Sequence, residues 1–192
     1  MAEILLFHHA LGQTPGVLAF ADELRKAGHV VHTPDLYEGR TFTDVNEGVQ
    51  HAGKEVGFDT IRERGRAAAE GLPDELVYAG FSLGAMPAQE LAQTRPGTQG
   101  ALLFHSAIPP AEFGSPWPNG VPLQIHIMEN DPWAEEDIPA ARELAENEGA
   151  ELFLYPGDVH LFADTSTPDY DEEAAAALKQ RVLAFLNQVD NT

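Results

Sequence analysis

The sequence predicts a single α/β domain in which a mostly parallel sheet of about six strands has helices on both faces. Six short β-type runs alternate with longer amphipathic segments along the 192 residues, a pattern typical of βα units. Several of the short runs are apolar throughout, as is typical of strands buried on both faces of a parallel sheet. No repeat or linker interrupts the alternation, so we expect one domain over residues 1–192, which is long enough for a full hydrophobic core.

The first half of the chain is expected to contain three strands and three helices. The strands are predicted at residues 3–8, 29–33 and 75–81, and the helices at 15–26, 58–70 and 83–94. The first helix places Phe20 and Leu24 on one face, and Gly28, the residue type preferred just past a helix end, follows it. The polar, glycine-rich segment from Glu38 to the second helix is predicted as a connection.

The second half is expected to contain three more strands and two helices. The strands are predicted at residues 101–105, 123–128 and 151–155, and the helices at 138–147 and 171–189. Asp171, Glu172 and Glu173 place negative charge at the start of the last helix, where the helix dipole favours it. Binding sites in open α/β sheets lie beyond the carboxyl ends of the strands. The residues that follow each strand are therefore the candidates for function.

Composition and charge exclude several classes of function. The chain has 11 Lys and Arg against 31 Asp and Glu, a net charge of −20. An acidic surface repels phosphate backbones and anionic lipids, so we expect neither a nucleic acid nor a membrane as a partner. The absence of cysteine excludes disulfides, thiolate metal sites and a cysteine nucleophile. No apolar run reaches the ~20 residues of a membrane span and no export signal is present, so we expect a cytoplasmic location.

The segment Gly80-Phe81-Ser82-Leu83-Gly84, after the third strand, predicts a nucleophilic serine. A serine on a sharp strand-to-helix turn has a strained backbone, which requires nearly absent side chains two positions before and two after it. Such a turn also directs the Leu83 amide and the start of the next helix toward an oxyanion. The alternative is a helix N-cap serine that lies between two glycines by chance.

A nucleophilic serine needs a base and a group that orients the base. Asp131 follows the fifth strand and His160 follows the sixth. The order Ser82, Asp131, His160 is the one expected for an α/β-hydrolase. All three lie in loops at the carboxyl ends of strands, where they can converge. Taken alone, Asp131 also fits a turn-forming Asn-Asp-Pro segment, and His160 a histidine of a surface loop.

The loop after the first strand, His8-His9-Ala10-Leu11-Gly12, is where such folds place the second oxyanion donor, a main-chain N–H. Ala10 is the candidate donor, and His9 is expected to line the site. Adjacent histidines also suggest a metal site. Neighbours at a strand end point apart, however, and no carboxylate cluster is near them, so we expect neither a metal nor a cofactor. His105 ends the fourth strand and is either a pocket residue or a core histidine.

Together these motifs resemble those of the dienelactone hydrolase family of α/β-hydrolases, over nearly the whole chain. The similar segments are Pro34-Asp35-Leu36-Tyr37, the serine turn, the aspartate before a short aromatic turn, and Tyr155-x-Gly-x-x-His160-x-Phe162. The resemblance implies that Ser82, Asp131 and His160 form a catalytic triad. It also implies an oxyanion hole made by the amides of Ala10 and Leu83.

The chain departs from the family pattern at several points. Ser82 stands where the best-known members have cysteine, which implies ordinary serine-hydrolase chemistry. His9 stands in place of a glutamate near the oxyanion loop, and Asp164 in place of the arginine that binds the substrate carboxylate. We therefore expect Asp164 to give the pocket a negative group that favours neutral or cationic esters. The usual N-terminal strands before the oxyanion strand are missing, so a smaller sheet of about six strands is expected.

The expected reaction is hydrolysis of a small ester or lactone through an acyl-enzyme, with that small molecule as the predicted partner. Trp117, on the long proline-rich loop 107–120, is expected to wall the pocket together with Trp133 and Tyr37, with ordinary packing as the alternative. Two other classes compete with an enzyme. One is a non-catalytic relative that binds a small ligand in the same cleft. The other is a flavodoxin-like binding domain, which requires a phosphate-binding loop that residues 8–12 do not provide.

Overall fold

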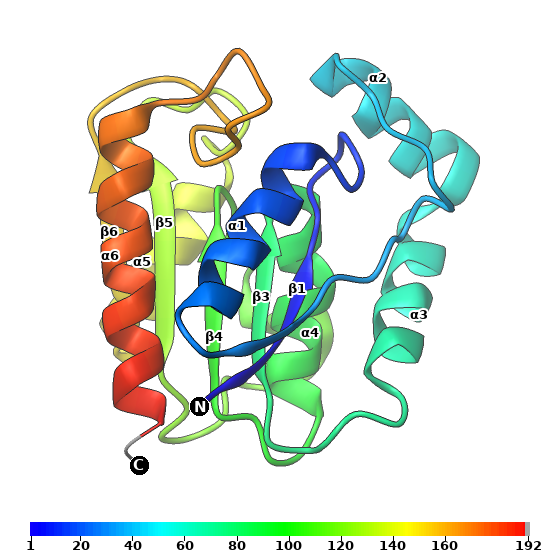
Figure 1. The fold of residues 1–192 in the computed structure, drawn as a ribbon. Helices are drawn as coiled ribbons and strands as arrows, with labels where there is room; N and C mark the ends of the chain where they lie inside the picture. The colour runs from blue at the N-terminus through cyan, green and yellow to red at the C-terminus, as the bar shows by residue number, and fades with distance from the viewer. Residues whose placement is uncertain (191–192) are drawn as a thin grey trace.

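The computed structural model describes residues 1–190 and contains one six-stranded sheet in the order β2-β1-β3-β4-β5-β6, with every neighbouring pair parallel (Figure 1). The strands are β1 (Glu3–Phe7), β2 (Val30–His32), β3 (Val77–Phe81), β4 (Gly100–Phe104), β5 (Leu123–Met128) and β6 (Glu151–Tyr155). Their ends lie close to those predicted. The fold class and the six strands expected from the sequence are confirmed.

Helices cover both faces of the sheet, as Figure 1 shows. They are α1 (Pro15–Lys26), α2 (Val45–Gln50), α3 (Phe58–Ala69), α4 (Ala85–Thr94), α5 (Asp137–Glu148) and α6 (Glu172–Val189). Side chains of a strand alternate between the two faces. Accordingly, Val77, Ala79 and Phe81 of β3 pack with α1 and α6, whereas Tyr78 packs with α3, α4 and α5. Two apolar layers therefore enclose β3 and hold its carboxyl end in place.

Side-chain caps define where helices α1 and α6 begin. The Thr14 hydroxyl accepts a hydrogen bond from the Val17 N–H at 3.3 Å, one residue before the proline that opens α1. The Asp171 carboxylate accepts from the Ala174 N–H at 2.9 Å, and the next two residues are glutamates. The acidic residues expected at the start of the last helix are therefore confirmed as a cap and a charged first turn.

The segment between β2 and α3 differs from the predicted polar connection. It forms α2 and then a π-helical turn, η1 (His51–Val56). Gly48 and Gly53 lower the helix propensity of this segment, so its pattern does not stand out in the sequence. Tertiary packing compensates for the low helix propensity, because Gly48 lies directly against the loop after β1. A Cβ on Gly48 would be 2.2 Å from the Ala10 carbonyl oxygen. Short helices gain most of their stability from such tertiary contacts.

The carboxyl ends of the parallel strands meet at one edge of the sheet, and the N-terminus and the end of α6 lie at the opposite edge, at the bottom of Figure 1. The Met1 amino group pairs there with Asp190 at 2.8 Å. Within residues 1–190, no helix combines the length and the apolar character needed to cross a membrane. The residues after β1, β3, β5 and β6 thus share the edge opposite Met1 and the end of α6.

Candidate active site

The turn between β3 and α4 holds Ser82 in the left-handed backbone region, with a φ of +49°. Ser82 opens a short 3-10 turn, η2 (Ser82–Gly84), that leads into α4. A Cβ on Gly80 would lie 2.0 Å from the Gly84 carbonyl oxygen. A Cβ on Gly84 would lie 2.6 Å from the carbonyl oxygens of Phe7 and His8 at the end of β1. Both glycines are therefore required for the sharp turn that presents the Ser82 hydroxyl.

Ser82, His160 and Asp131 form a continuous line of hydrogen bonds. The Ser82 Oγ lies 2.7 Å from the His160 Nε2, and the His160 Nδ1 lies 2.6 Å from the Asp131 Oδ2. An ionised carboxylate only accepts hydrogen bonds, so Nδ1 carries the proton and Nε2 accepts from the hydroxyl. Asp131 and His160 are buried, whereas Ser82 is partly exposed. This arrangement can move the serine proton to the imidazole and stabilise the imidazolium beside a buried carboxylate.

Main-chain hydrogen bonds hold the loops that carry Asp131 and His160. The Asn130 N–H donates to the Gly157 carbonyl at 3.0 Å, which joins the loop after β5 to the loop after β6. The Asp131 Oδ1 accepts from the Trp133 N–H at 2.9 Å, so the backbone fixes the rotation of the carboxylate. The oxygen that faces His160 is therefore held by the turn itself.

The loop after β1 contains His8, a buried histidine with both ring nitrogens occupied. Its Nδ1 donates to the His9 carbonyl at 2.7 Å, and its Nε2 accepts from the Leu36 N–H at 2.9 Å. Burial lowers the pKa of His8 to about 4, although the bond to the His9 carbonyl acts in the opposite direction. This histidine is neutral and fixes the shape of the loop.

The two candidate oxyanion donors come from neighbouring strands. Ala10 lies in the loop after β1, and Leu83 is the second residue of η2, after β3. The close approach of Gly84 to the His8 carbonyl brings these two segments together. The first N–H groups of a helix have no partner within the helix, so the Leu83 amide at the start of η2 is available to a ligand.

Asp164 lies inside the protein, 2% exposed, and accepts four hydrogen bonds. Its Oδ2 accepts from the His9 Nε2 at 2.7 Å and the Thr14 hydroxyl at 2.5 Å. Its Oδ1 accepts from the Ser166 N–H at 2.7 Å and the Ser166 hydroxyl at 2.6 Å. Burial alone would raise the pKa of this carboxyl, but the bonds from His9, Ser166 and Thr14 lower it to about 2.

The position of Asp164 differs from that of a carboxylate whose oxygens face a substrate. Both oxygens of Asp164 already accept hydrogen bonds from internal donors, so the carboxylate is not presented on a pocket wall. Its partner His9 is fully buried as well. These are the two positions at which the sequence departs from the family's glutamate and arginine, and the structure brings them into direct contact.

His105 has a φ of +66° and packs among aromatic rings, 1% exposed. Its ring centroid is 4.7 Å from that of Phe162 and 5.8 Å from those of Phe81 and His160. Among residues 1–190, neither ring nitrogen finds a hydrogen-bond partner. Burial, followed by the nearby histidines, lowers its pKa well below the usual value. This placement corresponds to the core alternative, with a neutral imidazole packed beside His160.

The three aromatic residues expected in the pocket have different surroundings. Tyr37 is buried under α2, and its hydroxyl reaches the Gly48 carbonyl at 3.4 Å. Trp117 is also buried, with its Nε1 donating to the Val121 carbonyl at 2.9 Å. Trp133 is 43% exposed, and its ring centroid lies 6.1 Å from that of His160. Of the three, only Trp133 has exposed surface beside the hydrogen-bond line.

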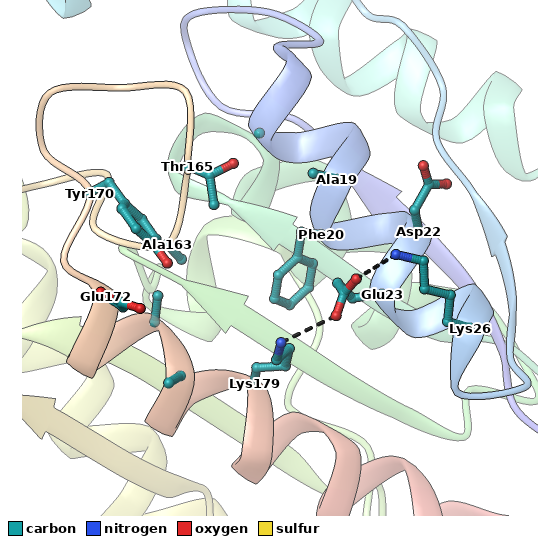
Figure 2. Close-up of a pocket in the computed structure, with 13 residues that line it drawn as sticks. Ala19, Phe20, Asp22, Glu23, Lys26, Ala163, Thr165, Tyr170, Glu172 and Lys179 are labelled. Atoms are coloured by element: carbon teal, nitrogen blue, oxygen red, sulfur yellow. Dashed lines mark hydrogen bonds and ion pairs between the residues drawn. The ribbon is translucent and has the colours of Figure 1, made fainter.

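Figure 2 shows a groove between α1 and α6, with a volume of about 440 Å³. Charged side chains of both signs rim it, and Glu23 bridges Lys26 and Lys179 at 2.8 and 3.2 Å. Of the described residues that line the groove, none belongs to the hydrogen-bond line at Ser82. The groove is therefore separate from the chemistry at the ends of the strands.

Three residues that contact the site were not identified from the sequence: Thr14, Gly48 and Ser166. The capping role of Thr14 is recognisable in the sequence, because a threonine before a proline at a helix start indicates a cap. Its contact with Asp164 is not indicated by any local sequence pattern. Ser166 and Gly48 contact residues far away in the chain, so only the fold reveals their position.

A sequence profile of the dienelactone hydrolase family matches residues 2–190. A search of curated proteins finds no match. A dienelactone hydrolase-like promiscuous phosphotriesterase from metagenomic libraries has a TM-score of 0.76 at 18% identity, over 98% of this chain and 87% of that one. A dienelactone hydrolase from Anabaena variabilis has a TM-score of 0.67 at 20% identity, over 98% and 86%. Esterase 2 of Thermogutta terrifontis, phosphonylated by cyclosarin, has a TM-score of 0.65 at 16% identity, over 98% and 83%.

The solved structures share little sequence identity with this chain, so their similarity shows the fold alone, which is that of the α/β-hydrolases. The profile match is a separate observation, and it extends over nearly every residue of the chain. The resemblance expected from the serine turn and the histidine loop is thus confirmed by a comparison of whole sequences. The chain belongs to the dienelactone hydrolase family.

Proposed function

We propose that this protein is a serine hydrolase that cleaves a small ester or lactone through an acyl-enzyme. The observation that carries the proposal is the hydrogen-bond line from the Ser82 hydroxyl through His160 to Asp131, with distances of 2.7 and 2.6 Å. Family membership supports ester hydrolysis as the reaction class. Ser82 is the nucleophile, His160 the general base and Asp131 the group that orients the base.

In the first step the Ser82 Oγ attacks the substrate carbonyl carbon while the His160 Nε2 accepts the hydroxyl proton. Asp131 keeps the imidazole in its Nδ1–H tautomer and stabilises the imidazolium. The tetrahedral oxyanion accepts hydrogen bonds from the amides of Ala10 and Leu83. One such donor typically contributes about 10²- to 10³-fold in rate. His160 then protonates the leaving alkoxide, and the acyl-enzyme remains.

In the second step water attacks the acyl carbonyl, with His160 again as the base. Collapse of the second tetrahedral intermediate returns the proton to the Ser82 Oγ and releases a carboxylic acid. With a lactone, the leaving alkoxide stays attached to the acyl group, so the product is a hydroxy acid. Trp133, with its exposed face beside His160, is a wall against which the substrate can pack.

Two structural relatives guide the choice of a probe. The Thermogutta terrifontis esterase is phosphonylated by cyclosarin, and the metagenomic relative is a phosphotriesterase. Both names describe chemistry at organophosphorus centres. A fluorophosphonate is therefore a suitable reagent for Ser82 in this chain, because only an activated hydroxyl displaces its fluoride.

Replacement of the nucleophile tests the proposal. Ser82→Ala removes only a hydroxyl on a turn, so it should leave folding intact and lower turnover of p-nitrophenyl acetate by about 10⁶-fold. Ser115→Ala, on the loop before β5, is the matched control and should retain wild-type turnover. Circular dichroism verifies that both variants fold. A Ser82→Ala enzyme with more than a tenth of the wild-type activity would exclude the assignment.

A further inference from the structure

The two peptide groups that flank Ala10 are both fixed by hydrogen bonds or close packing. The His9 carbonyl oxygen accepts from the His8 Nδ1 at 2.7 Å and from the Gly12 N–H at 3.0 Å. The carbonyl and the N–H of a trans peptide point in opposite directions. The Ala10 N–H, which belongs to the same peptide group, therefore points away from these donors. Within residues 1–190 it has no hydrogen-bond partner.

The next peptide group is held at both ends. The Ala10 carbonyl faces Gly48 of α2, where a Cβ would lie 2.2 Å from the oxygen. The Leu11 N–H, on the opposite side of this peptide, donates to the His9 Nδ1 at 3.2 Å. Of the two adjacent amides, that of Leu11 is occupied by His9 and that of Ala10 is left free.

His9 can accept the hydrogen bond from the Leu11 N–H in only one of its tautomers. The Nδ1 must be unprotonated, so the proton lies on Nε2. That Nε2–H donates to the Asp164 Oδ2 at 2.7 Å, with both residues buried. The Thr14 hydroxyl and Ser166 hold the carboxylate in place. A Cβ on Gly16 would lie 1.7 Å from the Asp164 Oδ1, so the start of α1 also packs on this carboxylate.

We propose that Asp164 is a positioning residue for the oxyanion hole, because it fixes the His9 tautomer that binds the Leu11 amide and leaves the Ala10 amide free. The proposal rests on the function proposed above. It gives this acid–imidazole pair a role parallel to that of Asp131 and His160, with the proton on the other ring nitrogen. Asp164 also joins the loop that carries His160 to the loop that carries Ala10, so one carboxylate aligns both.

Asp164→Asn is the most direct test, because the neighbouring backbone dictates which way the amide turns. The Ser166 N–H is a fixed donor at 2.7 Å, so the amide oxygen must face it. The amide NH₂ then faces the His9 Nε2, which has to become an acceptor. The proton moves to Nδ1, and the Leu11 N–H loses its acceptor. The Ala10–Leu11 peptide is released with almost no change in side-chain volume.

Two substitutions of His9 separate its two contacts. An asparagine can accept from the main-chain N–H two residues later, as in an Asx-turn. His9→Asn therefore keeps an acceptor for Leu11 and loses the contact with Asp164, whereas His9→Phe loses both. Asp22→Asn, an exposed aspartate on α1, is the control for the Asp-to-Asn change.

Steady-state kinetics with p-nitrophenyl acetate provides the first readout. We expect Asp164→Asn and His9→Phe to lower kcat by about 10- to 100-fold with KM within about threefold, because an oxyanion donor acts in the transition state. His9→Asn should stay within about fivefold of the wild-type kcat, and Asp22→Asn should equal the wild type. A purely structural role would instead lower the melting temperature and affect His9→Asn as much as His9→Phe.

Histidine ¹⁵N chemical shifts provide a readout that does not depend on activity. The wild type should show His9 protonated on Nε2, and Asp164→Asn should move the proton to Nδ1. A wild-type His9 protonated on Nδ1 would overturn the proposal, as would a folded Asp164→Asn enzyme with kcat within threefold of the wild type. If Asp164→Asn does not fold, equal kcat values for His9→Asn and His9→Phe would overturn it. An Nε2–H tautomer in a protein that neither hydrolyses esters nor reacts with a fluorophosphonate would show that the proposed function has failed instead.

Discussion

At the residue scale, Ser82 and its neighbour on the next strand, His105, are two of the three non-glycine residues with positive φ among residues 1–190, the third being Glu38. Ser82 and His105 have φ values of +49° and +66°, and a non-glycine residue in this region costs on the order of 1 kcal/mol. The two residues follow β3 and β4 at positions where the strands pair directly, Phe81 opposite Phe104. Such strain persists only where the surrounding packing determines the geometry, which here includes the close contact of Gly80 with Gly84.

Asp131→Asn should lower kcat by about 10⁴-fold, as expected when the base is held in the wrong tautomer. The Trp133 N–H donates to the Asp131 Oδ1 at 2.9 Å, so the asparagine oxygen should take that position and its NH₂ should face the His160 Nδ1. His160 then carries its proton on Nε2 and cannot accept the serine proton. Ester turnover by the purified variant measures the effect.

Asp158→Asn, at an exposed aspartate two residues before the base, is the matched control and should have wild-type turnover. A folded Asp131→Asn protein with kcat within tenfold of the wild type would contradict the orienting role of Asp131.

The sequence is informative about Ser82, Asp131 and His160 because each follows a strand and the strands themselves are recognisable. It is uninformative about the partner of His9. Asp164 lies 155 positions away, and no local pattern connects the two. The expectation of a pocket-facing charge at Asp164 came from the resemblance, because Asp164 stands in the position of the family's carboxylate-binding arginine. Burial and hydrogen bonding depend on tertiary contacts, which a single sequence does not encode locally.

At the scale of elements, α2 is the part of the fold that sequence patterning did not predict. Its glycine, Gly48, is unfavourable for a helix but necessary for contact with the Ala10 carbonyl. The strands were predictable because they are apolar runs bounded by turns, and the long helices because their apolar residues recur with helical spacing. A six-residue helix has too few turns to show such a pattern.

Gly48→Ala should impair both catalysis and stability. The added methyl would lie 2.2 Å from the Ala10 carbonyl oxygen, so the Ala10–Leu11 peptide or α2 has to move. We expect kcat to fall by tenfold or more with KM little changed, and the free energy of unfolding to fall by about 1–3 kcal/mol, as is usual for overpacking. Kinetics and urea unfolding of the same preparation measure the two effects.

Gly53→Ala in the adjacent π-helical turn is the control, since its Cβ would meet only the Phe58 ring at an ordinary 3.5 Å. This variant should keep wild-type kcat. Equal kcat values for Gly48→Ala and Gly53→Ala would show that α2 does not hold the oxyanion loop.

At the scale of the whole molecule, the fold buries several neutral imidazoles. Burial lowers the pKa of His8 to about 4 and that of His126 to about 3, and lowers that of His105 well below the usual value. In the unfolded chain these groups titrate near ~6.5. Below that pH the unfolded chain binds protons that the folded protein does not bind, so acid favours unfolding. The pH range over which this stability is lost extends from about pH 6.5 down to about pH 4 for His8 and about pH 3 for His126.

His105→Phe should weaken this dependence on pH. Each buried histidine that stays neutral contributes a slope of up to about 1.4 kcal/mol per pH unit to the free energy of unfolding well below pH 6.5. Urea unfolding of wild type and variant between pH 7 and pH 5 should therefore show a slope that is smaller for His105→Phe by about 1 kcal/mol per pH unit, averaged over this range. A difference in backbone strain between histidine and phenylalanine at this position shifts the free energy of unfolding without changing its slope with pH, and all other titratable groups are common to the two proteins. If the free energy of unfolding has the same slope with pH in both proteins, His105 is not a neutral, buried histidine.

The proposed reaction requires Ser82 to be an activated nucleophile, and covalent labelling detects such a residue. The protein is incubated with a fluorophosphonate at pH 7.5, digested, and analysed by mass spectrometry beside Ser82→Ala and Asp131→Asn. We expect one phosphonyl adduct on the Ser82 peptide of the wild type, no adduct on Ser82→Ala, and much slower labelling of Asp131→Asn. A folded wild-type protein that remains unlabelled, or a Ser82→Ala variant that is labelled as fast as the wild type, would exclude Ser82 as the nucleophile.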